Sequence, residues 1–299
     1  MPELPEAEVV ARQIRDRLLG ATLTDLRIGR TDIVREGYRT RGWYSGTRLQ
    51  AVARYGKSVA LRFTKNKEVR YIVAELGMTG LLLFPSAQTR HPQHVHVRLT
   101  FFGGREQELR YWNPRRFGRM SLLDQAGLER YLDRRFGHDP LTVSTETFHQ
   151  IIRGRRGRLK PLLMHQQTIA GIGNIYANEI LFRVGIHPNA IASVLRPKTV
   201  EQLYEVTREV LHEAIACGGS SVRDFFAPDG TEGHFKLHHL VYGKEGEPCP
   251  NRCGQVIRRL SGERSSFYCP VCQVKRPGRG RADSSRSGLL RQVSVITDT

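Results

Sequence analysis

Four cysteines near the C-terminus constrain this chain more than any other feature. They follow the pattern Cys249-x3-Cys253-x15-Cys269-x2-Cys272, within a segment too short to bury a hydrophobic core of its own. Two close cysteine pairs in a chain without an export signal are typical of a tetrahedral zinc site, and four thiolates leave no open position for catalysis. The alternative, two disulfides in a secreted module, is disfavoured because the N-terminus is acidic and lacks an apolar segment. We therefore expect one structural zinc ion, without which this module does not fold.

The balance of charge predicts a polyanionic partner. The 299 residues include 47 Lys plus Arg against 29 Asp plus Glu, which gives a net charge of +18 and a pI near 10.3. Such an excess is typical of proteins that bind nucleic acid. Binding to an anionic membrane surface is the weaker alternative, because no amphipathic helix supports it and no apolar run approaches the ~20 residues of a membrane span. The sequence therefore predicts an intracellular protein that does not enter a membrane.

Hydrophobic periodicity predicts a β-rich first region. Over Leu23–Leu123, short alternating stretches such as Ser58–Phe63 and Val95–Leu99 are separated by glycines, which predicts strands in an antiparallel sandwich or barrel. A helix over Ala7–Leu19 precedes them, with apolar side chains at i, i+4 spacing and Gly20 as its stop.

After residue 136 the pattern changes to helical spacing. Helices are expected over four ranges: Phe148–Ile152, Leu159–Gln166, Ile175–Val184 and Thr199–Ala216. The predicted fold class is therefore α+β multidomain. Its expected parts are an antiparallel β-sandwich with a flanking helix over 1–135, a helical domain over 136–238, a zinc hairpin over 239–273 and a basic tail over 274–299. The tail is rich in Arg, Ser and Gly, so we expect it to be disordered.

The N-terminal residues suggest covalent chemistry. Removal of Met1 leaves Pro2 with a free secondary amine, which can attack an electrophilic carbon and form an iminium, the electron sink of a lyase. Glu3 is placed to act as general acid and base beside that amine, and Glu6 to orient it electrostatically. The alternative is that Pro2 and Pro5 only stiffen the entry to a helix.

Several motifs occur together, in an order that resembles one known family. They are the N-terminal Met-Pro-Glu-Leu-Pro-Glu, Arg54–Ser58, Gly77–Gly80, Asn113–Gly118, Gly171–Ala177 and the cysteine module. In this combination the chain resembles formamidopyrimidine-DNA glycosylase, the bacterial enzyme that removes oxidised purines from DNA. The resemblance covers residues 2 to about 273. It implies a bifunctional glycosylase and AP lyase that forms a Schiff base on Pro2 and carries out β,δ-elimination on damaged double-stranded DNA. It further implies a cytoplasmic, monomeric protein.

The resemblance also implies roles for single residues. Pro2 is the expected nucleophile at C1′, Glu3 the proton shuttle, and Lys57 the lysine beside the lesion and its phosphate. Met78, Arg115 and Phe117 match the side chains that fill the gap left by a flipped nucleotide, since flipping costs a few kcal/mol of stacking. Arg115 is expected to face the orphaned cytosine, and Arg116 to contact a phosphate. Without the family, Met78 and Phe117 read as core residues and both arginines as a solvated turn.

Further site residues are expected in the second half of the chain. Gly171–Asn174 lies between two predicted helices, where glycines let a backbone approach a phosphate and Asn174 caps the following helix. Lys160 closes a basic stretch that favours a phosphate track over a plain solvated loop. By resemblance, Glu179 lines the active site, and Ser220, Ser221 and Arg223 belong to a loop that closes over an oxidised purine. Arg264 matches the family's phosphate-contacting finger arginine.

Two departures from the family pattern bear on the site. The first cysteine pair has three intervening residues where the family usually has two, so zinc is expected to bind with a widened loop. The position before Leu76 is commonly His in the family and is Glu75 here. A histidine contact to DNA is therefore not carried over, and a carboxylate near phosphate is unfavourable.

Two rival functions remain open from the sequence. Endonuclease VIII, of the same superfamily, prefers oxidised pyrimidines, but its branch typically begins Pro-Glu-Gly-Pro-Glu, whereas Leu4 stands here. A non-catalytic DNA-binding module with a zinc finger is the rival from another class.

Overall fold

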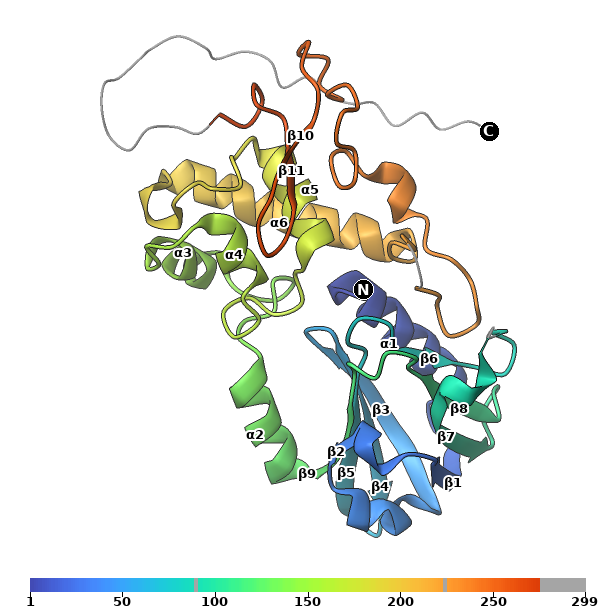
Figure 1. The fold of residues 1–299 in the computed structure, drawn as a ribbon. Helices are drawn as coiled ribbons and strands as arrows, with labels where there is room; N and C mark the ends of the chain where they lie inside the picture. Colours follow the sequence, from blue (N-terminus) through green and yellow to red (C-terminus); the bar gives the residue numbers. More distant parts are fainter. Residues whose placement is uncertain (89–90, 223–224, 275–299) are drawn as a thin grey trace.

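The computed structural model describes residues 1–88, 91–222 and 225–274. A β-rich part, a helical part and a small hairpin follow one another along the chain (Figure 1). The predicted pocket residue Arg223 and residues 275–299 of the expected tail lie outside the described residues. No described helix is both long and apolar enough to cross a membrane.

The β-rich part is a single curled sheet, in the strand order β2-β9-β5-β4-β3-β1-β7-β8-β6. Its strands are β1 (Thr22–Ile28), β2 (Val34–Glu36), β3 (Thr47–Tyr55), β4 (Ser58–Lys65), β5 (Glu68–Glu75), β6 (Leu81–Leu83), β7 (Val95–Phe102), β8 (Glu108–Trp112) and β9 (Met120–Asp124). Every neighbouring pair is antiparallel except β2 and β9, which run parallel at one edge. The predicted antiparallel β architecture is thus confirmed, with one parallel edge pair that the alternation could not reveal.

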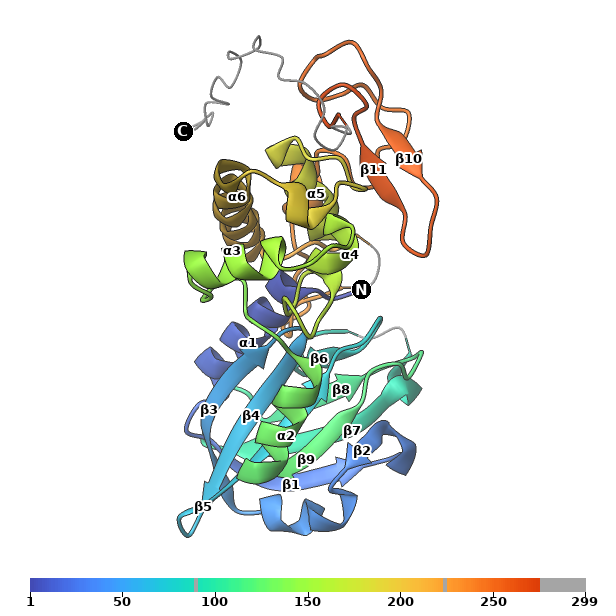
Figure 2. The same cartoon turned by 90° about the vertical axis from the view of Figure 1, so that its left-hand side faces the viewer.

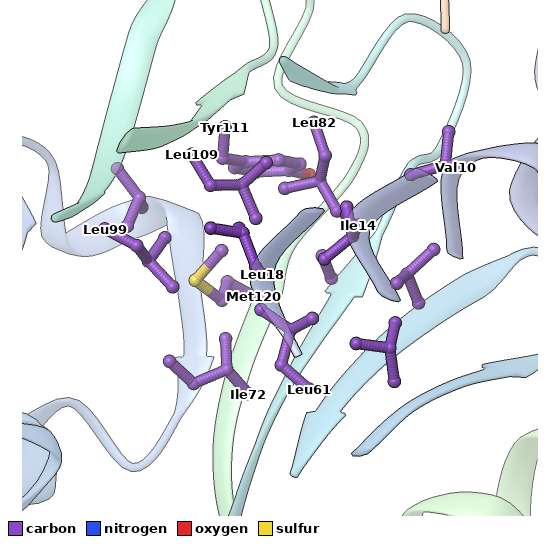
Figure 3. Packing of buried hydrophobic residues seen from close by; sticks show 14 of the residues in the cluster. Val10, Ile14, Leu18, Leu61, Ile72, Leu82, Leu99, Leu109, Tyr111 and Met120 are labelled. Atoms are coloured by element: carbon purple, nitrogen blue, oxygen red, sulfur yellow. The ribbon is translucent and has the colours of Figure 1, made fainter. Parts of the chain in front are cut away.

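Helix α1 (Leu4–Leu18) fills the inside of the curled sheet. Val10, Ile14 and Leu18 are fully buried and pack against side chains from strands on both sides (Figure 3). Leu4, at the start of the helix, belongs instead to the core of the helical part. A single helix therefore ties the two cores together. It begins three residues before the predicted Ala7, because Pro5 suits the first turn and Glu6 accepts the Glu3 N–H.

Helix α2 (Gln125–Arg135) covers the outer face of the sheet (Figure 2). Its Leu128 and Tyr131 pack on Ala60, Tyr71 and Val73. The helix was not predicted, although its first turn carries a signal, since the Asp124 carboxylate accepts the Gly127 N–H at 2.7 Å.

The helical part packs around its own core. Its helices are α3 (Thr145–Arg153), α4 (Leu159–Met164), α5 (Asn174–Val184) and α6 (Pro197–Ala216). All four predicted helices are present, with shifted ends. Short 3₁₀ helices complete the chain: η1 (Thr31–Ile33), η2 (Tyr38–Tyr44), η3 (Pro92–His94), η4 (Ala192–Val194) and η5 (Phe235–His238).

The C-terminal hairpin, β10 (Arg258–Leu260) and β11 (Ser266–Tyr268), rests on α5. Its small core joins Phe182 of α5 with Val241, Ile257, Cys249 and Cys269. The Phe267 N–H also donates to Oδ1 of Asn178 at 2.8 Å. The hairpin is therefore held by the helical part as well as by its cysteines.

Candidate active site

The N-terminal residues are held between α1 and the loop that precedes α5. Pro2 and Glu3 are buried, and the Leu4 N–H donates to the Gly171 carbonyl at 2.9 Å. Gly171 has φ of +95°, and a Cβ there would lie 2.7 Å from the Leu4 side chain. Glycine is thus required for the close approach that fixes the start of the chain.

The Glu3 carboxylate occupies the N-terminus of α5. Its Oε2 accepts the N–H of Gly173 at 2.8 Å and that of Tyr176 at 3.4 Å, and its Oε1 accepts the N–H of Ile175 at 3.0 Å. A Cβ on Gly173 would lie 2.3 Å from the Glu3 carboxyl carbon. Amides at a helix N-terminus attract an anion, and here the anion is a side chain of the protein itself.

This arrangement corrects two expectations. The predicted use of the Gly171–Asn174 amides for a phosphate is wrong for Gly173, because Glu3 already takes its N–H. Asn174 is not the helix cap either. Gly173 holds the cap position and Asn174 is the first residue of α5, where its carbonyl accepts from Asn178 Nδ2 at 2.6 Å. Glu3 supplies the capping acceptor that a cap side chain normally provides.

Glu6 connects three segments that are distant in sequence. Its Oε1 accepts the Tyr176 hydroxyl at 2.5 Å and the Ser220 N–H at 2.7 Å, while Oε2 accepts the Glu3 N–H at 2.8 Å. Burial raises the pKa of Glu6, and the charge of Glu3 raises it further. We call Glu3, Glu6, Tyr176 and Ser220, with the amides that bind them, the Glu3–Glu6 network.

Lys57 lies at the turn between β3 and β4. A Cβ on the neighbouring Gly56 would lie 2.7 Å from the Phe136 ring, so the turn is seated closely against the segment that leads into the helical part. Burial lowers the pKa of Lys57; the charges of Glu3 and Glu6 oppose this shift, whereas that of Arg264 adds to it. Lys57 is therefore electrostatically coupled to the predicted catalytic residues.

Lys160 is buried rather than displayed on a surface track. Its Nζ donates to the Ser265 carbonyl at 2.7 Å and to the Ser266 hydroxyl at 2.8 Å, both in the hairpin beside Arg264. Burial lowers the pKa of Lys160 to about 8. The described contacts make it a clamp on the hairpin tip, and a contact with DNA phosphate stays a prediction.

The predicted base-reading residues project from two loops, residues 76–80 and 113–119, which we call the reading loops. The loops touch backbone to backbone, because a Cβ on Gly77 would lie 2.5 Å from the Gly118 nitrogen. Met78 is 38% and Phe117 57% exposed, which excludes the core interpretation for both. The Arg115 guanidinium lies over the Phe117 ring at 4.9 Å, and Arg116 pairs with Asp32 at 3.1 Å.

Glu75 is not an isolated negative charge. Its carboxylate pairs with Arg35, through contacts of 3.1 and 3.2 Å, and with Arg135 at 3.4 Å. Two guanidiniums thus offset the carboxylate that stands at the family's usual histidine position.

The predicted lesion-pocket residues fall into two groups. Ser220 and Ser221 are buried; the Ser220 hydroxyl meets His239 Nε2 at 2.9 Å, and the Ser221 hydroxyl donates to the Phe225 carbonyl at 2.7 Å. Glu179 is fully buried and accepts three N–H groups, those of Leu240, Val241 and Tyr242. It lines no open cavity among the described residues and instead positions the segment that leads to the hairpin, which corrects the expectation for it.

The four cysteines of the hairpin module converge. Their Sγ atoms all lie within 4.8 Å of one another, with Cys249 to Cys272 at 3.7 Å and Cys253 to Cys269 at 3.4 Å. Four sulfurs bound to zinc at about 2.3 Å stand ~3.8 Å apart, so the set fits that ion. The widened loop contributes a further contact, because Asn251 Nδ2 lies 3.4 Å from Cys272 Sγ.

Tyr176 and His239 belong to the site but were assigned no role from the sequence. Tyr176 lies inside the Gly171–Ala177 motif, yet its partner Glu6 is 170 residues away. Burial lowers the pKa of His239 to about 4, which keeps the ring neutral at pH 7. No local sequence signal announces either contact, because both depend on how α1 and the loop at residue 220 meet.

Models of two known domain families match the chain. The formamidopyrimidine-DNA glycosylase N-terminal domain matches residues 1–120, and the formamidopyrimidine-DNA glycosylase H2TH domain matches residues 136–226. The chain is 38% identical over 282 residues to a formamidopyrimidine-DNA glycosylase of Methylobacillus flagellatus, covering 93% of this chain and 98% of the relative. A relative from Aromatoleum aromaticum is 39% identical over 280 residues, covering 91% and 99%.

Solved structures agree with these matches. The crystal structure of the MutM (Fpg) protein from Thermus thermophilus has a TM-score of 0.79 and 35% identity, covering 92% of this chain and all of that one. A Lactococcus lactis Fpg mutant in complex with a Fapy-dG containing DNA has a TM-score of 0.80 and 30% identity, with the same coverage.

Proposed function

The chain belongs to the formamidopyrimidine-DNA glycosylase family, and on this premise we propose how its own residues carry out the chemistry. It is a DNA glycosylase of base excision repair with the AP lyase activity typical of the family. We assign it oxidised purines, 8-oxoguanine and formamidopyrimidines, in double-stranded DNA.

The observation that carries the assignment of residues is the Glu3–Glu6 network. It holds Pro2 beside a carboxylate whose oxygens are both fixed by α5 amides. A nucleophile and a proton-transfer group fixed beside each other are what base excision through a covalent intermediate requires.

In the proposed reaction, removal of Met1 frees the Pro2 ring nitrogen, whose lone pair attacks C1′ of the damaged nucleotide. The bond from C1′ to the base breaks, and the base leaves after gaining a proton. The nitrogen then loses its proton, Glu3 protonates the sugar ring oxygen, and the sugar ring opens to leave an iminium between Pro2 and C1′. The iminium acidifies the C2′ proton, so its loss expels the 3′ phosphate, and a second elimination expels the 5′ phosphate.

The basic residues around this centre are proposed to hold the phosphates next to the lesion. Lys57 and Arg264 bring positive charge close to Glu3, and Lys160 holds the hairpin tip that bears Arg264. A guanidinium and an ammonium suit the phosphate that leaves and the one that stays.

We also propose that Cys249, Cys253, Cys269 and Cys272 hold one structural zinc ion. When bound, zinc would join the two cysteine pairs and stabilise the hairpin. We further propose that the protein acts as a monomer in the cytoplasm, on damaged duplex DNA.

The assignment is tested by borohydride trapping on duplexes that carry 8-oxoguanine or thymine glycol. We expect a covalent adduct and faster excision with 8-oxoguanine. A protein that retains Met1 is the matched control, because it keeps every side chain but blocks the amine. Preference for thymine glycol would favour the endonuclease VIII branch, and trapping by the Met1-retaining protein would exclude Pro2 as nucleophile.

A further inference from the structure

A pocket beside α2 is lined by four arginines. Its volume is about 320 Å³, and Arg35 of β2 faces Arg130, Arg134 and Arg135 of α2 across it, with Glu36 at the same site. All of these arginines except the half-buried Arg135 are exposed. The pocket lies outside the Glu3–Glu6 network and the hairpin.

The described residues do not neutralise this pocket. Arg35 and Arg135 share the Glu75 carboxylate, but Arg130 and Arg134 form no ion pair within the part of the chain that the structure describes. Four guanidiniums against the carboxylates of Glu36 and Glu75 leave a local charge of about +2. Because Arg130 and Arg134 are one helical turn apart, their charges repel, and an anion between them relieves the repulsion.

The pocket borders the segments expected to meet DNA. Glu75, which holds Arg35 and Arg135, is three residues before Met78, and its N–H donates to the Arg119 carbonyl at 2.8 Å, beside the reading loops. At the other end, the Arg134 carbonyl accepts Gln167 Nε2 at 2.7 Å, in the loop that leads to Gly171. The arginines thus stand between the reading loops and the helical part.

We propose that this arginine pocket binds phosphodiester groups of the same duplex, beyond the lesion, and adds affinity without reading sequence. The inference rests on the proposed function, since it needs a duplex placed on the reading loops. An open, solvent-facing set of guanidinium forks suits a continuous backbone, because each fork can grip one phosphate in two directions. Glu75 keeps two of the forks in place while Arg130 and Arg134 remain available.

The test compares the double variant R130Q/R134Q with R27Q/R105Q, which removes the same charge from two arginines that are 79% and 75% exposed and lie outside the pocket. Binding to a duplex with an uncleavable abasic analogue is measured from about 50 to 200 mM salt. Each lost phosphate contact lowers the salt slope by about one, so R130Q/R134Q should lose about tenfold less affinity over this range than wild type does. R27Q/R105Q should keep the wild-type slope.

Duplex length distinguishes the possible ligands. On a duplex shortened until it no longer reaches α2, the slopes of wild type and R130Q/R134Q should coincide. Equal slopes on the long duplex would overturn the proposal, as would a variant that loses thermal protection by inorganic phosphate while keeping the wild-type slope. Failure of the proposed function is separate, because wild type would then excise no oxidised purine.

Discussion

The Glu3–Glu6 network and the reading loops place functional side chains in opposite ways. In the network, each carboxylate oxygen already accepts a hydrogen bond from the protein, and both carboxylates are 1% exposed. In the reading loops, Met78 and Phe117 project into solvent, and Arg115 rests only on a ring.

This difference separates two tasks. Groups that move protons benefit from a geometry fixed before DNA arrives, since reorganisation costs rate. Groups that replace a flipped base must keep contact surface available, and the close approach of Gly77 to Gly118 fixes only their base. Changes in the network should therefore affect chemistry, and changes in the loops should affect discrimination.

The largest effect is expected from Gly173→Ala. The new Cβ would lie 2.3 Å from the Glu3 carboxyl carbon, so the carboxylate or the start of α5 must move. Excision in single-turnover assays should fall by about 10²–10⁴-fold, the usual contribution of a positioned acid or base. Gly157→Ala is the control, because nothing lies within 4 Å of its Cβ. Equal rates for the two variants would contradict a fixed role for Glu3.

Loss of metal should separate binding from the network. Cys269→Ser, or chelation, should unfold the hairpin and weaken duplex binding by roughly a hundredfold, as Arg264 and its surroundings are lost. The control is Cys217→Ser, which changes a free cysteine outside the cluster. Metal content and binding are measured together, and stoichiometric zinc should accompany only the control. Purified wild-type protein without zinc would contradict the assignment.

The next effect concerns the base opposite the lesion. Cytosine offers O2 and N3 as acceptors to Arg115, whereas adenine presents an amino donor beside N1. Excision should be faster opposite cytosine by about 1–3 kcal/mol, and Arg115→Ala should reduce this preference. Arg116→Ala should weaken binding equally for both pairs, as loss of a phosphate contact does. A full cytosine preference in Arg115→Ala would show that another residue reads the base.

The smallest effect is a pH dependence of stability. The pKa of His239 is about 4 when folded and ~6.5 when unfolded, so the unfolded chain binds more protons between these values and stability falls as the pH falls through this window. From about pH 7.5 to 5, wild type should lose about 1–2 kcal/mol more unfolding free energy than His239→Gln. Denaturant unfolding at both pH values measures this. An identical loss in both proteins would mean that the ring is not held neutral.

Much of the molecule was predictable because its signals are local. Strand alternation, helical spacing and the cysteine pairs all act within a few residues. Helix α2 was missed because its apolar side chains are few, although Asp124 marks its start. The burial of Glu179 and Lys160 was missed because their partners lie 61 and 105 residues away.

The catalytic region shows where sequence reasoning stops. Glycines before α5 predict a bound anion, but only the fold shows that Glu3 is that anion. The widened cysteine loop raised a geometric question, and the structure answers it with Arg252 at φ of +52° and four converging sulfurs.

The central claim, that Pro2 attacks C1′, is tested most directly by the site of the trapped adduct. After borohydride reduction on an 8-oxoguanine duplex, mass spectrometry of the N-terminal peptide should find it without Met1 and with the sugar remnant on Pro2. A remnant on Lys57, or an adduct on a peptide that still carries Met1, would contradict the account.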